Sequence, residues 1–293
     1  MEWDKQPLTW PNRAFGRMVE CRPHRWYVQE AGSGALVLLL HGAGASTHSF
    51  RALMPDLARD FHVLALDLPG QGFSRAGARH RLGLEPMAAD IAALLAQLHL
   101  RPDAIIGHSA GAAIALRLTQ ILPVAPRAVV AINGALGHFK GVAGWLFPAL
   151  AKLLALNPLT AMIFARTASS EESVRRLLTS TGSRTDAEGV ALYRTLVADR
   201  GHVDGTLAMM SQWSLETLLR ELPQITVPVL FLTGANDRAV PPDTSDLAAA
   251  RMPNAEVVRI DGLGHMLHEE DPGGTAARIR DYLGRNGVGS RPG

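Results

Sequence analysis

The chain of 293 residues contains little cysteine, little lysine and few aromatic residues. Cys21 is its one cysteine, which excludes an internal disulfide framework and fits a reducing compartment. Of the 29 basic residues only Lys5, Lys140 and Lys152 are lysines, and the arginines are scattered along the sequence. Because they form no basic stripe with interleaved aromatics, nucleic-acid binding has little support.

Long hydrophobic runs and cofactor motifs are missing as well. No segment reaches the roughly 18 apolar residues of a membrane-spanning helix, and the first residues lack the apolar centre of a signal peptide. The sequence has no Cys/His cluster and no glycine-rich P-loop. We therefore expect no metal, no cofactor and no transmembrane segment. We expect a cytoplasmic protein, and leave open a peripheral attachment to a membrane.

Apolar residues make up 47% of the sequence, enough for a sizeable core, and many stand in short runs. A strand pair is predicted first, at 18–21 and 25–29. Further runs indicate buried strands at 36–40, 62–66, 104–106, 127–132, 229–232 and 257–260. Helical stretches separate them, notably 87–98 and 111–120. This alternation predicts the α/β class, a mostly parallel sheet with helices on both faces.

One long stretch, residues 133–222, interrupts the alternation. It contains no convincing strand and shows helical patterns at 141–156, 171–178 and 187–197. Because it falls between two predicted strands, it is placed to cover the carboxyl edge of the sheet. We predict a core formed by residues 1–132 and 223–293, and a helical cap formed by residues 133–222.

The most informative motif is Gly-His-Ser-Ala-Gly at 107–111, between a predicted strand and a predicted helix. It fits G-x-S-x-G, the tight turn that presents a nucleophilic serine at the edge of a sheet. Its two glycines keep side chains out of the crossing of strand and helix. We predict Ser109 as the nucleophile.

The partners that an activated serine needs follow in the order Ser, Asp, His. Asp237 comes just after one predicted strand, and His265 lies in a glycine-rich loop after the next. Histidine can take the serine proton and return it, while the carboxylate fixes its tautomer and stabilises the imidazolium. Asp261 is the alternative acid and His268 the alternative base. We interpret His268 as a residue that supports the site.

A His-Gly-Ala-Gly loop at 41–44 follows the strand at 36–40. Such a loop supplies one backbone N–H to a developing oxyanion, and the residue after the nucleophile supplies the other. We assign these donors to Ala43 and Ala110. His41 is interpreted chiefly as a brace of the loop, and His108 as a residue that lines the site or packs under it.

Large apolar side chains recur in the predicted cap. They either pack the cap onto the core or line a broad apolar pocket, and both alternatives stay open. The candidate substrate-pocket residues are His41, His108, Trp145, Phe147, Met162, Met209, Met210 and Trp213. The helix at 141–156 has a second alternative, a membrane surface, which its aromatics favour and its few cations disfavour.

These residues resemble the α/β-hydrolase superfamily over nearly the whole chain. A narrower resemblance is carried by five segments: Trp-Pro-Asn-Arg at 10–13, the loop at 41–50, the serine turn and following helix at 107–116, Ile-Asn-Gly-Ala-Leu at 132–136 and Met-Met-Ser-Gln-Trp at 209–213. These segments are similar to the magnesium-chelatase accessory hydrolases of bacteriochlorophyll biosynthesis. The resemblance implies the α/β-hydrolase fold and a role near magnesium insertion into protoporphyrin IX, but no particular bond. Ala43 and Phe50 stand where that family's pattern has Thr and Trp.

Three functions follow from these features. The one we expect is a serine hydrolase acting on an ester-like or other acyl group of an apolar small molecule, with a tetrapyrrole as a candidate. The second is a non-catalytic accessory that binds porphyrin or contacts magnesium-chelatase subunits. The third is other chemistry open to the same triad, such as C–C bond hydrolysis. Dehalogenation is disfavoured, because it uses a carboxylate where this chain has Ser109.

Overall fold

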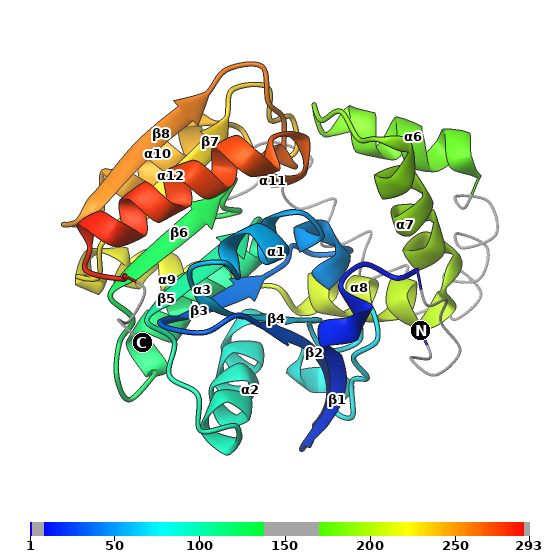
Figure 1. Cartoon of the computed structure of the whole chain (residues 1–293), viewed down its shortest axis with the longest axis horizontal. Helices are drawn as coiled ribbons and strands as arrows, with labels where there is room; N and C mark the ends of the chain where they lie inside the picture. The colour runs from blue at the N-terminus through cyan, green and yellow to red at the C-terminus, as the bar shows by residue number, and fades with distance from the viewer. Residues whose placement is uncertain (2–8, 138–169, 290–293) are drawn as a thin grey trace.

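The computed structural model describes residues 1, 9–137 and 170–289. Within them, one eight-stranded sheet has the order β1-β2-β4-β3-β5-β6-β7-β8 (Figure 1). β2 pairs antiparallel with both β1 and β4, and the strands from β4 to β8 are parallel to one another. The mostly parallel α/β sheet predicted from the sequence is confirmed.

The strand bounds agree with the sequence prediction to within two residues. The strands are β1 (Gly16–Cys21), β2 (His24–Ala31), β3 (Leu36–Leu40), β4 (His62–Leu66), β5 (Ala104–His108), β6 (Ala128–Ile132), β7 (Val229–Gly234) and β8 (Ala255–Ile260). Every residue of β3, β5, β6 and β7 is buried. A strand that is covered on both faces needs apolar side chains throughout, which is why these runs show no polar alternation.

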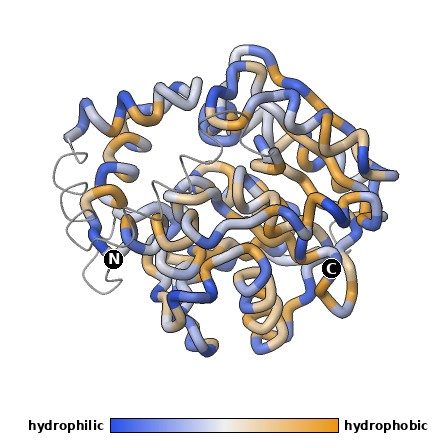
Figure 2. Tube along the Cα trace, turned by 180° about the vertical axis from the view of Figure 1, so that it is seen from behind, coloured by the Kyte–Doolittle hydropathy of each residue, from blue (hydrophilic) through white to orange (hydrophobic). Residues whose placement is uncertain are grey.

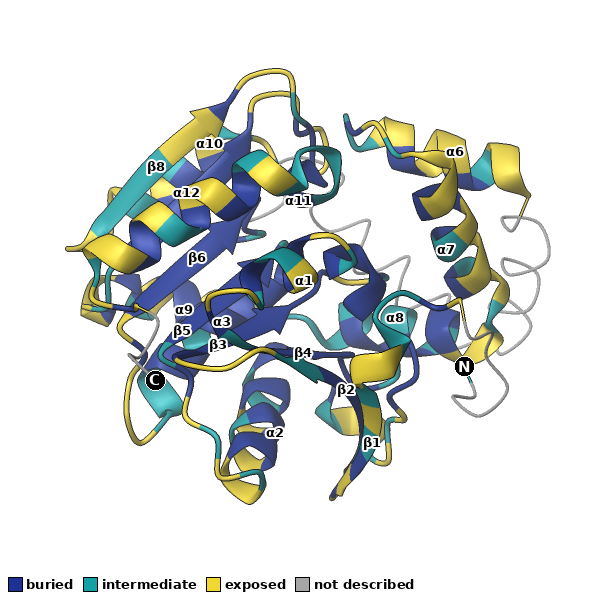
Figure 3. Ribbon diagram, in the orientation of Figure 1, coloured by how far each residue is buried: buried dark blue, intermediate teal, exposed yellow. Residues whose placement is uncertain are grey.

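Helices cover both faces of the sheet (Figure 3). Those of the core are α1 (Leu53–Leu57), α2 (Leu84–Gln97), α3 (Ala110–Ile121), α10 (Asp243–Ala249), α11 (Leu267–Glu270) and α12 (Pro272–Arg285). Because side chains alternate along a strand, Leu38 of β3 packs in the cluster with α2 and α3, whereas Leu39 packs with α1 and α12. Figure 2 shows the hydrophobic residues following these strands through the interior.

Between β6 and β7 the described part of the chain, from residue 170 on, is helical. Its helices are α6 (Glu171–Ser180), α7 (Ala187–Ala198), α8 (Arg200–Gln212) and α9 (Glu216–Glu221). Ser170, Asp186 and Asp199 begin the first three by accepting a backbone N–H in the first turn, as N-cap residues do. Short 3-10 helices complete the described elements: η2 (Arg13–Phe15), η3 (Thr47–Phe50), η4 (Arg79–Arg81) and η5 (Leu222–Gln224).

The helices α6 and α7 match the patterns at 171–178 and 187–197. The sequence did not indicate α8 as a helix, because Gly201 and Gly205 lower its helix propensity. Gly205 is needed there, since a Cβ would lie 2.0 Å from the carbonyl oxygen of Gly70 in the core. The predicted helix at 141–156 lies outside the described residues, and the division into core and cap stays a prediction.

Candidate active site

The serine of the Gly-His-Ser-Ala-Gly turn has an unusual backbone conformation. Ser109 has φ 53° and ψ −115°, which is costly for a residue with a side chain. Its N–H donates to the carbonyl of Ile132 at 2.9 Å, and its own carbonyl accepts from Ala112 and Ala135, both at 3.1 Å. These bonds to β6, to α3 and to the chain after β6 hold the turn. The serine itself stays partly accessible at the carboxyl edge of the sheet.

Glycine is required on both sides of Ser109. A Cβ on Gly107 would lie 2.3 Å from the carbonyl oxygen of Gly111, and one on Gly111 would lie 2.1 Å from that of Leu40. Strand, turn and helix therefore cross in direct backbone contact. Gly42 also faces the turn, since its Cβ would lie 3.0 Å from Cβ of Ser109.

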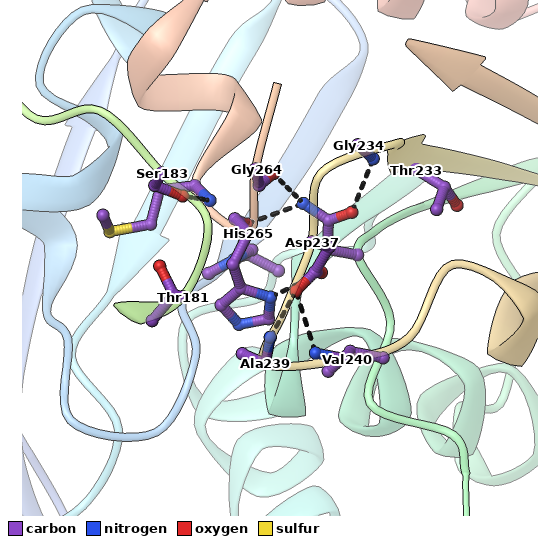
Figure 4. Close-up of polar contacts among 12 residues, drawn as sticks. Thr181, Ser183, Thr233, Gly234, Asp237, Ala239, Val240, Gly264 and His265 are labelled. Atoms are coloured by element: carbon purple, nitrogen blue, oxygen red, sulfur yellow. Dashed lines mark hydrogen bonds and ion pairs between the residues drawn. The ribbon is translucent and has the colours of Figure 1, made fainter. Parts of the chain in front are cut away.

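Asp237 and His265 are directly paired (Figure 4). His265 Nδ1 lies 2.7 Å from Asp237 Oδ2, with the carboxyl side chain 0% and the imidazole 11% exposed. The other oxygen, Oδ1, accepts the N–H groups of Ala239 and Val240 at 2.8 Å. An acid held in this way favours the proton on His265 Nδ1 and leaves Nε2 as the proton acceptor. The alternative acid, Asp261, is exposed after β8.

We call residues 235–242, between β7 and α10, the acid loop, and residues 261–266, between β8 and α11, the base loop. Asn133, the first residue after β6, joins the base loop to Gly234, the last residue of β7, directly before the acid loop. Its Nδ2 donates to the carbonyls of Gly264 and His265 at 3.0 and 2.7 Å, and its Oδ1 accepts from Gly234 N–H at 2.8 Å. Asn133 is buried and has φ 45°, which asparagine tolerates better than most residues.

His108 packs between two other histidines. Its ring centroid is 4.8 Å from that of His265 and 4.5 Å from that of His268. Its Nε2–H donates to the carbonyl of His265 at 2.9 Å. Burial lowers the pKa of His108 well below its ordinary value, so the ring is neutral. The contacts are those of a residue that packs beside the base loop, one of the two alternatives expected for it.

His268 and His41 are both neutral and enclosed. Burial lowers the pKa of each to about 3. His268 Nε2 lies 3.1 Å from Ser49 Oγ. The histidine paired with Asp237 is therefore His265 and not the alternative, His268. His41 Nδ1–H donates to the carbonyl of Gly42 at 2.7 Å, and its Nε2 accepts from Leu68 N–H at 2.9 Å. With 0% exposure, His41 braces its loop and offers no surface to a ligand.

The two predicted oxyanion donors lie on the elements expected. Ala110 is the first residue of α3, where N–H groups have no partner within the helix. Ala43 is exposed in the loop after β3. That loop is held by Gly44 N–H, which donates to Gln71 Oε1 at 2.7 Å.

Apart from His41 and His108, the six predicted pocket residues divide into three groups. Met209 is 1% exposed, contacts Gln71 Nε2 through Sδ at 3.0 Å and belongs to a core cluster, against which the half-buried Trp213 also packs. These two side chains attach α8 to the core. Met210 is also half-buried. Trp145, Phe147 and Met162 lie outside the described residues.

The broad apolar pocket considered from the sequence stays a prediction, because three of its candidate residues lie outside the described residues. Among the described residues, one cavity lies beside His268, and its lining is largely polar. It measures about 370 Å³, and its lining includes Asn12, Ser49, Arg51, Asp186 and Glu269, but neither Ser109 nor His265. Across residues 9–137 and 170–289, no group of three His, Cys, Asp or Glu side chains could hold a metal ion. In the same part of the chain, no helix is long and apolar enough to cross a membrane.

Similarity to known proteins agrees with this fold. A family model described as "alpha/beta hydrolase fold" matches residues 35–272. The magnesium-chelatase 30 kDa subunit of Rhodobacter capsulatus is 47% identical over 279 residues, which cover 94% of this chain and 97% of that protein. The pimeloyl-[acyl-carrier protein] methyl ester esterase of Methylococcus capsulatus is 27% identical, over 88% of this chain and 98% of the esterase.

Solved structures show the same fold at lower identity. The epoxide hydrolase CorEH superposes with a TM-score of 0.78 at 21% identity, over 92% of this chain and 98% of that one. A likeness of this degree concerns the fold, since one fold carries many chemistries. The sheet order, the matched span of sequence and the relatives all lead to one conclusion: the chain belongs to the α/β-hydrolase fold family.

Proposed function

We propose that the protein is a serine hydrolase that acts on an ester-like or other acyl substrate. The observation that carries the proposal is the 2.7 Å bond between His265 Nδ1 and Asp237 Oδ2, at the same sheet edge as the strained Ser109 turn. Ser109 is the nucleophile, His265 the base and Asp237 the residue that orients it. Backbone N–H groups of Ala43 and Ala110 stabilise the oxyanion.

The reaction proceeds in two halves. His265 Nε2 takes the proton of Ser109 Oγ as the oxygen attacks the acyl carbon, and the carbonyl oxygen becomes an oxyanion. The imidazolium then gives its proton to the leaving oxygen, and the acyl group stays on Ser109. Water attacks that ester with His265 again as base, which returns the serine hydroxyl and releases an acid. One missing oxyanion donor typically raises the barrier by about 2.7–4 kcal/mol.

The relatives support a setting for this activity. One is named as a magnesium-chelatase subunit and another as a methyl ester esterase. We propose that the substrate is an apolar ester or acyl compound, with a tetrapyrrole as the leading candidate, near the magnesium-chelatase step of bacteriochlorophyll biosynthesis. Subunits of the chelatase are the candidate protein partners. The proposed location is the cytoplasm, which suits the free, buried thiol of Cys21.

A second function is favoured by one observation: the relative at 47% identity is named as a subunit of a chelatase and not as a hydrolase. On this alternative the protein binds porphyrin or contacts chelatase subunits without cutting a bond. The retained acid–base pair counts against it, because a binding protein has no need of a buried carboxylate aligned on an imidazole.

Labelling with a fluorophosphonate, read by intact mass, distinguishes the two functions without knowledge of the substrate. We expect one adduct on the wild type, none on Ser109→Ala, and one on the control Ser180→Ala, which changes an exposed serine of α6. A folded wild type that takes no adduct would contradict the hydrolase proposal. Tight porphyrin binding by Ser109→Ala, with full support of the pathway, would establish the accessory function.

A further inference from the structure

Residues 181–184, which we call the connecting segment, run from the end of α6 toward α7 along both catalytic loops. The carbonyl of Thr181 accepts from Arg238 N–H at 3.0 Å, directly after the acid. Ser183 Oγ accepts from Met266 N–H at 2.8 Å, directly after the base. Figure 4 shows Thr181 and Ser183 beside His265 and Asp237. One short segment outside the sheet therefore contacts the residue that follows each member of the pair.

A third contact passes through one carboxylate. Glu270 Oε2 accepts from Arg184 N–H at 3.0 Å, and its Oε1 accepts from Gly264 N–H at 2.9 Å. Gly264 directly precedes the catalytic base. The base loop is thus linked to the connecting segment on both sides of His265.

The segment and the loops touch backbone to backbone. Gly182 has φ +86°, and a Cβ there would lie 1.9 Å from the carbonyl oxygen of Asn236 in the acid loop. A Cβ on Gly264 would lie 2.3 Å from the carbonyl carbon of Gly182. Only glycine allows approaches this close. A small displacement of the segment would therefore move both loops.

The peptide between His265 and Met266 is held from opposite sides. Its carbonyl accepts from His108 Nε2 at 2.9 Å and from Asn133 Nδ2 at 2.7 Å, both in the core. Its N–H donates to Ser183, which is 2% exposed. Fixing this peptide plane fixes the direction in which the imidazole leaves the backbone, and so its alignment on Asp237.

We propose that Ser183 is a positioning residue for His265, and that the connecting segment couples the docking of α6 and α7 to the assembly of the acid–base pair. This inference rests on the proposed hydrolase function. His265 transfers protons in both halves of the reaction, so a misaligned imidazole lowers kcat. Substrate binding depends on other surfaces, so KM stays nearly constant.

The test compares Ser183→Ala with Ser183→Thr, which keeps a hydroxyl, and with the control Ser180→Ala. We measure kcat and KM on p-nitrophenyl butyrate, the rate of fluorophosphonate inactivation, and the downfield NMR resonance of the His265–Asp237 proton. Losing the acceptor of a buried N–H should lower kcat and the inactivation rate by about tenfold in Ser183→Ala. It should also shift or broaden the resonance. Ser183→Thr should restore both, and Ser180→Ala should match the wild type.

A lower melting temperature in Ser183→Ala with unchanged rates and an unchanged resonance would overturn the proposal, because Ser183 would then be merely structural. If Ser183→Ala does not fold, Glu270→Gln removes one of the two acceptors that link Gly264 to Arg184, and the same readouts decide. Failure of the hydrolase proposal is distinguishable, since the wild type itself would then resist labelling. The resonance would still report whether Ser183 aligns the pair.

Discussion

The proposed nucleophile and the proposed acid–base pair are held by different regions of the molecule. Around Ser109 the contacts are backbone packing among buried strands and α3, in which nine of the twelve residues are buried. Around His265, hydrogen bonds from side chains add to close backbone contacts at Gly182 and Gly264, and some come from the segment after α6. In α6 itself only Val174 and Leu178 are buried. Backbone packing in the core therefore holds Ser109 in place, whereas directional hydrogen bonds orient His265 and Asp237.

Such a division has consequences for how each half fails. A packed glycine crossing tolerates no added atom, so changes there should reduce stability and activity together. When a substitution removes a hydrogen bond from a loop, the loop's side chains lose their alignment before the protein unfolds. Changes to the hydrogen-bonding side chains around His265 should therefore separate activity from stability, whereas changes to the glycines beside Ser109 should not.

The largest effect is expected from Asp237→Asn. The amide keeps an oxygen for the N–H groups of Ala239 and Val240 but cannot hold His265 with its proton on Nδ1. We expect kcat to fall by about 10⁴-fold while the free energy of unfolding changes little. Steady-state kinetics and urea unfolding on one preparation measure both. A loss of activity below tenfold would remove Asp237 from the triad.

Gly111→Ala should have the next largest effect, and it tests the core half. The new Cβ would meet the carbonyl oxygen of Leu40 at 2.1 Å, so strand or helix must move. We expect the free energy of unfolding to fall by about 3 kcal/mol, near the upper end for overpacking, with loss of labelling at Ser109. Urea unfolding measures the first and a fluorophosphonate the second.

Gly284→Ala is the matched control for this change. Gly284 lies in α12, and a Cβ there would meet nothing within 4 Å. Alanine has the higher helix propensity, so stability should rise by up to about 1 kcal/mol. If Gly111→Ala were as stable as Gly284→Ala, the crossing at the nucleophile would not be the rigid contact described above.

A smaller effect is expected from Tyr193→Phe, which tests the polar attachment of α7 to the core. The Tyr193 hydroxyl donates to Glu269 Oε1 at 2.7 Å, and Arg51 binds the other oxygen of this buried carboxylate. Removing one donor from a buried carboxylate should lower the free energy of unfolding by about 1–2 kcal/mol. Thermal unfolding measures this loss.

The control removes a second tyrosine hydroxyl. Tyr282→Phe alters a buried ring of α12, which packs in the cluster with α1 and β3. For its hydroxyl, the described residues include no hydrogen-bond partner. A loss of stability as large in this variant as in Tyr193→Phe would mean that the bond to Glu269 contributes nothing specific.

The two regions also differ in how far the sequence predicts them. The strands and the Ser109 turn follow from local patterns, because apolar runs and a fixed glycine spacing are visible in a few residues. Asn133 and Ser183 could not be found in this way, since their partners lie more than 80 positions away along the chain. In the sequence, Asn133 was visible only as a small polar residue just after a predicted buried strand, within a segment that carries the family resemblance. The bond between His265 and Asp237 required the fold itself.

The effect that is smallest at neutral pH concerns two buried histidines, His268 beside His108 and His202 of α8. Burial lowers the pKa of His268 to about 3 and that of His202 to about 4, below the ordinary value near 6.5. Between these values the unfolded chain binds protons that the folded protein does not, so stability falls as the pH drops from about 6.5 toward 4. Asp67 opposes this trend, because burial raises its pKa to about 6.

The variant His268→Gln isolates one of these protons. Glutamine does not titrate, so the slope of unfolding free energy against pH should become shallower by up to about 1.4 kcal/mol per pH unit between pH 4 and 6. Urea unfolding at closely spaced pH values measures the slope. At pH 7.5 the variant should show only the pH-independent cost of the lost Ser49 contact. A slope equal to that of the wild type would mean that His268 is already protonated in the folded protein between pH 4 and 6. Water would then reach the His268 ring at the boundary between the two regions, despite its burial.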